Sequence, residues 1–149
     1  MRILLKTKVK GNYKKVMSLF DRDLFEALKP KAASMEIVEF TGSQKGDKVH
    51  IRFVKPIKAD WISLITEDHI DDTQAYFIDK GDVLPFPLKD WMHKHIVQKH
   101  TEDESVIVDD ISFSSGYKLL DLFIYPALYF GFYPRKAVYR KYFNKVFSA

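Results

Sequence analysis

The stretch YKLLDLFIYPALYFGFYPRKAVYRKYFNKVF, residues 117–147, decides the fold that the sequence predicts. Apolar side chains recur in it at spacings of three and four residues, which is typical of a long helix with one face directed at a core. Pro126 and Pro134 lie inside this pattern. Because each proline removes a backbone donor, we expect a kink or a short break at one or both. The core-facing positions are Leu120, Ile124, Ala127, Leu128, Gly131, Val138 and Tyr142.

The segments before this helix are predicted to be mainly extended. A strand over residues 2–9 is followed by two short helices, the second of which ends before Pro30. The six further strands are expected at 35–41, 48–55, 59–70, 74–80, 88–101 and 105–114. Short, turn-rich links favour antiparallel neighbours, since parallel ones need a long crossover. The sequence therefore predicts a single α+β domain over residues 1–149, with a curved antiparallel sheet of about seven strands wrapped on the C-terminal helix.

The composition is that of one globular domain without cysteine chemistry. Hydrophobic residues make up 46% and charged residues 30% of the 149, a balance typical of a packed core. Since cysteine is absent, disulfides, thiolate nucleophiles and cysteine-bound metals are excluded. The chain is locally basic only in its tail, where cations favour a helix C-terminus, so no nucleic-acid partner is predicted. The first residues lack the apolar length of a signal peptide, and we expect a cytoplasmic protein.

The element order and several short motifs resemble the START-like or SRPBCC superfamily, the helix-grip fold shared with pollen-allergen-like lipid carriers and polyketide cyclases. Residues 77–79 (FID), the loop 81–87 and residues 91–95 (WMHKH) are similar to a Phe-x-Asp, Gly-Pro, Trp-x-His-x-His pattern of uncharacterised bacterial members. Residues 105–113 (SVIVDDISF) and 133–135 (YPR) resemble a later strand and an aromatic-Arg element of the same group. The resemblance implies binding of lipids, polyketides, hormones or other apolar compounds, with catalysis in only some branches.

Two histidines are the first candidates for chemistry. Trp91, His93 and His95 alternate along a predicted strand, so their side chains project from one face. A His-x-His pair can bind a metal, but no third ligand follows at a suitable spacing, and neither a metal nor a cofactor is predicted. One histidine could instead orient a ligand carbonyl or move a proton, or both could be surface residues or ordinary hydrogen-bond partners.

Asp109 is the most informative acid, because it shares its strand phase with apolar residues that should face inward. A tight turn at residues 102–103 would place His95 opposite Asp110, whereas a turn of odd length would place it opposite Asp109. An Asp–His couple can serve acid-base chemistry in a cyclase-like or hydratase-like enzyme, or it can be a structural hydrogen bond. The sequence leaves both the register and the role open.

The gap between a concave sheet and one covering helix is the predicted binding site. The candidates for its wall and its polar contacts are Trp61, Tyr76, Phe77, Trp91, His93, His95, Asp109, Phe113, Tyr117, Phe123, Ile124 and Leu128. The function expected is binding or carriage of a hydrophobic small molecule of lipid, polyketide or aromatic type, without catalysis. The alternatives are a cyclase-like or hydratase-like enzyme and a protein-interaction module.

The interaction module would use the aromatic part of the C-terminal helix. Tyr129, Phe130 and Phe132 add apolar surface on several faces of that helix, more than one sheet can cover. We expect this surface to favour a homodimer over docking on a membrane, because the helix crossing the sheet already hides much of its apolar stripe.

Overall fold

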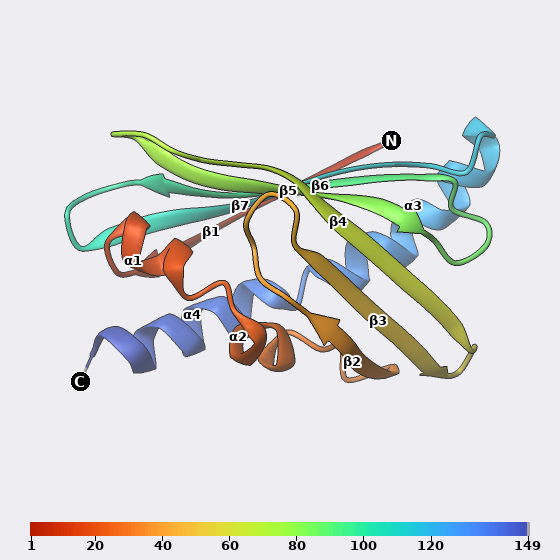
Figure 1. Cartoon of the computed structure of the whole chain (residues 1–149), viewed down its shortest axis with the longest axis horizontal. Helices are drawn as coiled ribbons and strands as arrows, with labels where there is room; N and C mark the ends of the chain where they lie inside the picture. Colours follow the sequence, from red (N-terminus) through yellow and green to blue (C-terminus); the bar gives the residue numbers. More distant parts are fainter. Residues whose placement is uncertain (149) are drawn as a thin grey trace.

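Seven antiparallel strands form one curved sheet in the spatial order β1-β7-β6-β5-β4-β3-β2, and the C-terminal helices cross beneath it (Figure 1). The computed structural model describes residues 1–148. The strands are β1 (Arg2–Lys10), β2 (Ser34–Phe40), β3 (Lys48–Lys55), β4 (Ala59–Ile70), β5 (Gln74–Val83), β6 (Asp90–Lys99) and β7 (Glu104–Ser114). The helices are α1 (Tyr13–Ser18), α2 (Arg22–Ala27), α3 (Lys118–Phe132) and α4 (Arg135–Phe147). This order confirms the predicted α+β helix-grip architecture.

The C-terminal helix is broken at one of its two prolines. Pro126 lies within α3, whereas Pro134 separates α3 from α4. After this break α4 packs along β1, while α3 contacts the end of the sheet at β7. The two halves of the predicted single helix therefore cover the sheet differently. Among residues 1–148, no helix combines the length and the apolar character that a membrane span requires.

The short helices α1 and α2 close one end of the space between the sheet and α4. Their N-termini are capped by side chains, since Asn12 accepts a hydrogen bond from the Lys14 backbone and Asp21 accepts one from the Leu24 backbone. Phe20, which lies between the two helices, packs against several other rings of the core. Its neighbours are Phe77 on β5 and Tyr139 and Phe143 on α4, with ring centroids 5.8, 6.1 and 6.5 Å away.

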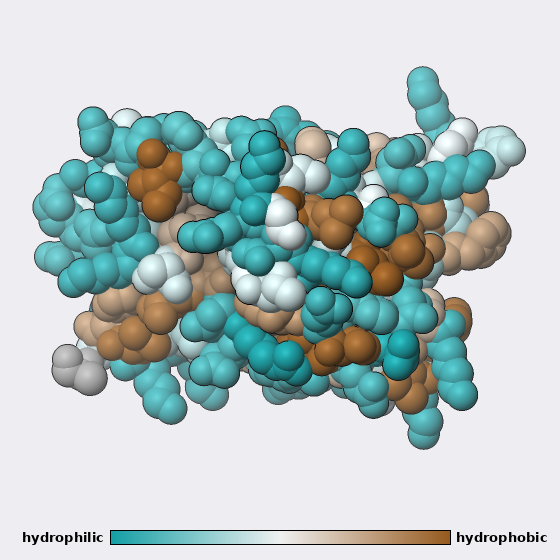
Figure 2. Space-filling view, viewed as in Figure 1, coloured by the Kyte–Doolittle hydropathy of each residue, from teal (hydrophilic) through white to brown (hydrophobic). Residues whose placement is uncertain are grey.

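A second group of buried side chains lies under the other half of the sheet, around Trp91 and Phe113. Side chains of α3 only partly fill this half, because many apolar residues of α3 point outward. Leu119, Leu122, Phe123 and Phe130 are 70%, 56%, 74% and 69% exposed. Figure 2 shows that hydrophilic side chains cover much of one face of the molecule and that hydrophobic ones form separate patches there. The loose fit of α3 leaves room beneath the sheet.

Candidate functional site

A cavity of about 200 Å³ lies between α3 and the concave face of the sheet. Most of its wall is apolar, and the polar exceptions gather on β5, β6 and the start of α4. The apolar lining consists of Phe25, Leu28, Pro30, Met35, Phe40, Val49, Ile51, Phe53, Trp61, Ile65, Phe77, Trp91, Ala127, Leu128 and Phe132. Gly42, Ser43, Ser63, Asp79, His93, His95, Gly131 and Arg135 complete the wall.

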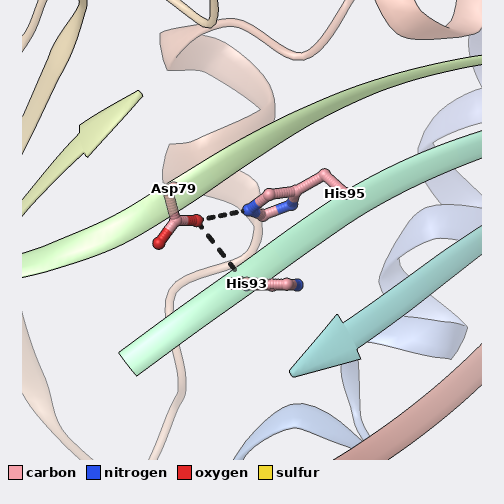
Figure 3. Close-up of side chains that lie close together, drawn as sticks. All are labelled: Asp79, His93 and His95. Atoms are coloured by element: carbon pink, nitrogen blue, oxygen red, sulfur yellow. Dashed lines mark hydrogen bonds and ion pairs between the residues drawn. The ribbon is translucent and has the colours of Figure 1, made fainter. Parts of the chain in front are cut away.

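The polar side chains of the wall form a buried network across three neighbouring strands. The Nε2 atom of His95 lies 2.5 Å from Oδ2 of Asp79, and Nε2 of His93 lies 2.9 Å from Oδ1 of Asp109. Trp91 donates from Nε1 to the other oxygen of Asp79 at 3.1 Å. The two imidazole rings stack with centroids 3.6 Å apart. Figure 3 shows Asp79 on β5 directed toward both histidines of β6.

The strand register explains these pairings. The pair Lys99–Ser105 encloses a turn of five residues, so the odd-length alternative is correct and His95 lies opposite Asp109. The hydrogen bonds nevertheless run to diagonal neighbours: His93 bonds Asp109, and His95 bonds Asp79 on the other side. Diagonal neighbours on adjacent strands are within reach of long side chains. At each histidine, the residue that lies opposite in the backbone register is therefore not the residue that its side chain bonds.

The network keeps its carboxylates ionised and His95 neutral. Burial alone would raise the pKa of Asp79, but the hydrogen bond from His95 and the neighbouring imidazoles outweigh it, and the pKa is lowered. In the same way, the hydrogen bond and charge of His93, with the charge of Arg135, lower the pKa of Asp109 against its burial. Burial and the charge of His93 lower the pKa of His95 to about 4. At neutral pH the His95 ring therefore donates from Nε2 and keeps a lone pair on Nδ1.

Two buried polar atoms of the cavity-lining residues lack hydrogen-bond partners within residues 1–148. One is Nδ1 of His95, and the other is Nη1 of Arg135. Arg135 is the first residue of α4, and its guanidinium carbon lies 4.4 Å from the centre of the Phe132 ring. One free acceptor and one free donor therefore belong to the polar part of the cavity wall.

Half of the predicted binding residues line the cavity. Trp61, Phe77, Trp91, His93, His95 and Leu128 do so. Asp109 is buried behind His93 and also lies 3.4 Å from the hydroxyl of Tyr139, so it supports the wall without forming it.

The other predicted binding residues lie away from the cavity. Tyr76 is on the opposite face of the sheet. Its hydroxyl donates a hydrogen bond to Glu67, and the ammonium group of Lys94 lies over its ring. Tyr117 and Phe123 are 67% and 74% exposed, because α3 turns that face outward. Phe113 and Ile124 pack in the core cluster around Trp91 instead.

Sequence reasoning missed two residues of the polar network, Asp79 and Arg135. A signal for Asp79 existed, because it lies two residues after Phe77 and so shares the inward phase of that strand. For Arg135 the only signal was the resemblance of residues 133–135 to an aromatic-Arg element, because its charge alone does not distinguish it from the other basic residues of the tail. Most of the apolar lining that was not predicted comes from α2, β2 and β3. These elements reach the cavity because the sheet is curved.

Phe132 was expected on an interaction surface and instead faces inward. Its ring packs against Trp91 and His93, with centroids 5.7 and 5.5 Å away. Tyr129 is only partly buried, and Phe130 is the most exposed residue of the predicted trio. Of the predicted trio, Phe130 therefore belongs to the apolar outer face of α3 and Phe132 does not.

The three residues Asp79, His93 and His95 also offer the donor set that a divalent metal would need. One ligand atom from each lies within 4.8 Å of the others, and all three residues are buried. Two donors bound to one ion at about 2.1 Å lie about 3 Å apart. His95 and Asp79 approach to 2.5 Å, which is the distance of a short hydrogen bond, and the cation Arg135 lines the same wall. The residues therefore fit a hydrogen-bonded network better than a metal centre.

Comparison with known proteins identifies the fold. No family model and no curated protein sequence matches the chain. Among solved structures, a truncated norcoclaurine synthase from Thalictrum flavum is 12% identical, with a TM-score of 0.67 over 100% of this chain and 94% of its own. A Thermobifida fusca protein is 10% identical, with a TM-score of 0.70 over 98% and 95%. A hypothetical protein from Helicobacter pylori is 18% identical, with a TM-score of 0.67 over 96% and 88%. The chain therefore has the helix-grip fold that its resemblance to the START-like superfamily implied.

Proposed function

We propose that this chain binds an apolar small molecule in the cavity beneath its sheet. One observation carries the proposal: a cavity of about 200 Å³ is walled mainly by aromatic and aliphatic side chains, with a buried polar network on one side. Small-molecule sites commonly combine an apolar wall with a few placed polar groups that fix orientation. His95 and Arg135, two residues of this wall, each carry a polar atom without a hydrogen-bond partner in the described chain.

The size of the cavity favours a compact ligand. An apolar cavity of about 150 Å³ can hold benzene, while sites for drug-sized ligands typically begin at about 300 Å³. A cavity of about 200 Å³ lies between these values and suits a compound of one or two rings better than a long lipid chain. Norcoclaurine synthase, which shares the fold, has been solved with dopamine and hydroxybenzaldehyde. Each of those ligands has a single ring, which supports the aromatic class for this chain.

Filling the cavity tests the proposal. Gly131 lines the cavity, and a Cβ atom built there meets no other atom within 4 Å, so a larger side chain can be accommodated. Native mass spectrometry of the purified protein should show a bound apolar compound that Gly131→Phe loses. The control Leu122→Phe adds a ring on the outer face of α3, where Leu122 is 56% exposed, and should keep the compound. Equal retention by both variants, or no adduct together with no uptake of 2-ethylnaphthalene, would contradict the proposal.

A cyclase-like or hydratase-like enzyme is the second candidate, and the Asp–His pairs favour it. Asp79 with His95 and Asp109 with His93 are ionisable pairs at the cavity wall, which is where acid-base residues are expected. The low pKa of His95 argues against it as a general base, because a group with pKa about 4 accepts protons weakly at neutral pH. Once a substrate is found, loss of turnover in His93→Ala or Asp109→Asn with unchanged ligand affinity would favour the enzyme.

A further inference from the structure

Arg135 is the only lysine or arginine among the cavity-lining residues of the described chain. Its Nη1 atom is buried without a hydrogen-bond partner, and no carboxylate of residues 1–148 lies within 4.0 Å of its guanidinium. The ring of Phe132 lies against the guanidinium carbon at 4.4 Å and holds it beside the cavity. The guanidinium is thus fixed in place, with one donor unused.

A buried donor without a hydrogen-bond partner is rare in folded proteins, because it has lost its hydrogen bonds to water without gaining others. Arg135 is placed there by the break at Pro134, which makes it the first residue of α4, and it reaches the wall that also contains His93 and His95. Both carboxylates of the network already have partners within the chain: Asp79 has His95 and Trp91, and Asp109 has His93 and Tyr139. An oxygen acceptor from outside the chain would therefore satisfy Nη1.

The charge of the network decides which oxygen acceptor fits. Asp79 and Asp109 are two buried carboxylates of this network, and Arg135 is the guanidinium on the same cavity wall. A ligand carboxylate would add a third negative charge in a buried place, where like charges repel strongly. A neutral carbonyl accepts the same hydrogen bond without adding charge.

We propose that the ligand carries a neutral carbonyl group, of the ketone, aldehyde or amide class, whose oxygen accepts a hydrogen bond from Nη1 of Arg135 while its ring occupies the cavity. The proposal rests on the cavity being a ligand site, as proposed above. It adds the chemical class of the ligand and assigns Arg135 as the residue that selects it. A hydrogen bond to a charged group should favour the carbonyl over a hydrocarbon of equal shape by about 10- to 100-fold.

Three matched probes test this selection: 2-acetylnaphthalene, 2-ethylnaphthalene and 2-naphthoate, measured by equilibrium dialysis at pH 7. The wild-type chain should bind the ketone at least tenfold tighter than the hydrocarbon and tighter than the carboxylate. Arg135→Met should bind the ketone and the hydrocarbon equally. Arg140→Met removes the same charge from an exposed position of α4 and should keep the preference for the ketone.

The outcomes separate this proposal from the one on which it rests. If ketone and hydrocarbon bind equally to the wild-type chain, Arg135 does not select the ligand, although the cavity still binds it. Tightest binding of 2-naphthoate would assign the site to anions and overturn the neutral carbonyl. If no probe binds, both proposals fail. Should Arg135→Met not fold, the test uses the carbonyl ¹³C chemical shift of labelled 2-acetylnaphthalene bound to the wild-type chain. A shift downfield of its value in hexane supports the hydrogen bond, and an unchanged value overturns it.

Discussion

Acidification should weaken the folded state through a single buried side chain, His95. Burial and the charge of His93 lower its pKa from the ordinary value of 6.5 to about 4 in the folded chain. In the unfolded chain the pKa returns to about 6.5. Because the unfolded state binds this proton more tightly, the stability linked to His95 is fully present above pH 6.5 and is lost as the pH falls toward 4.

The magnitude follows from the difference between the two pKa values. The two pKa values differ by about 2.5, and a pKa difference of one corresponds to about 1.4 kcal/mol. The stability linked to His95 is therefore roughly 3 kcal/mol over the whole pH range of its titration. Between pH 7 and pH 5 the loss should be about 2 kcal/mol. Asp79 and Asp109 add little to it in that window, since their pKa values lie below the ordinary 3.8 and their linked stability is lost only at lower pH.

Urea unfolding at pH 7 and pH 5, followed by tryptophan fluorescence, measures this loss. The variant His95→Gln keeps an N–H donor for Asp79 but cannot take up a proton, so its stability should fall about 2 kcal/mol less than that of the wild type. His100→Gln removes an exposed histidine from the turn after β6 and should behave like the wild type. A His95→Gln variant that loses as much stability as the wild type would refute the reasoning.

Three further outcomes are expected. Trp91→Phe removes the Nε1 donor to the buried Asp79 and should lower the free energy of unfolding by about 1–3 kcal/mol in urea titrations, whereas an unchanged midpoint would show that the bond contributes nothing. If the outer face of α3 mediates a homodimer, Phe123→Glu should abolish concentration-dependent association in analytical ultracentrifugation, and a wild type that is monomeric throughout would exclude the dimer. Treatment with EDTA should leave the melting temperature unchanged, because the Asp79–His95 distance fits a hydrogen bond better than two ligands of one ion, and a marked fall would instead show a bound metal.

The alternation of side chains made the fold and part of the site predictable from the sequence. Period-two patterning placed His93 and His95 on one common face of their strand and gave Asp109 the inward phase of its own, and all three side chains are buried. It could not identify the hydrogen-bond partners. Those depend on the length of the turn between β6 and β7 and on the reach to diagonal neighbours, and neither is encoded in the spacing along one strand.

The helical part of the binding site was predicted less well, and the reason is the Pro134 break. The apolar residues at spacings of three and four were treated as one core-facing stripe that runs through both prolines. In the structure α3 and α4 are separate helices, and α3 turns Tyr117 and Phe123 outward. Both prolines remove a backbone donor, so local chemistry does not say which one will end a helix. Packing against the sheet makes that choice.

The same break connects the fold to the site. After Pro134, α4 packs Tyr139 and Phe143 fully into the core beside β1, and this half of the sheet is closed. Before Pro134, α3 covers the other half of the sheet only loosely, and the cavity remains between α3 and the sheet. Arg135 lies at the boundary between the filled and the open half, which explains how a basic residue of the tail comes to face an apolar cavity.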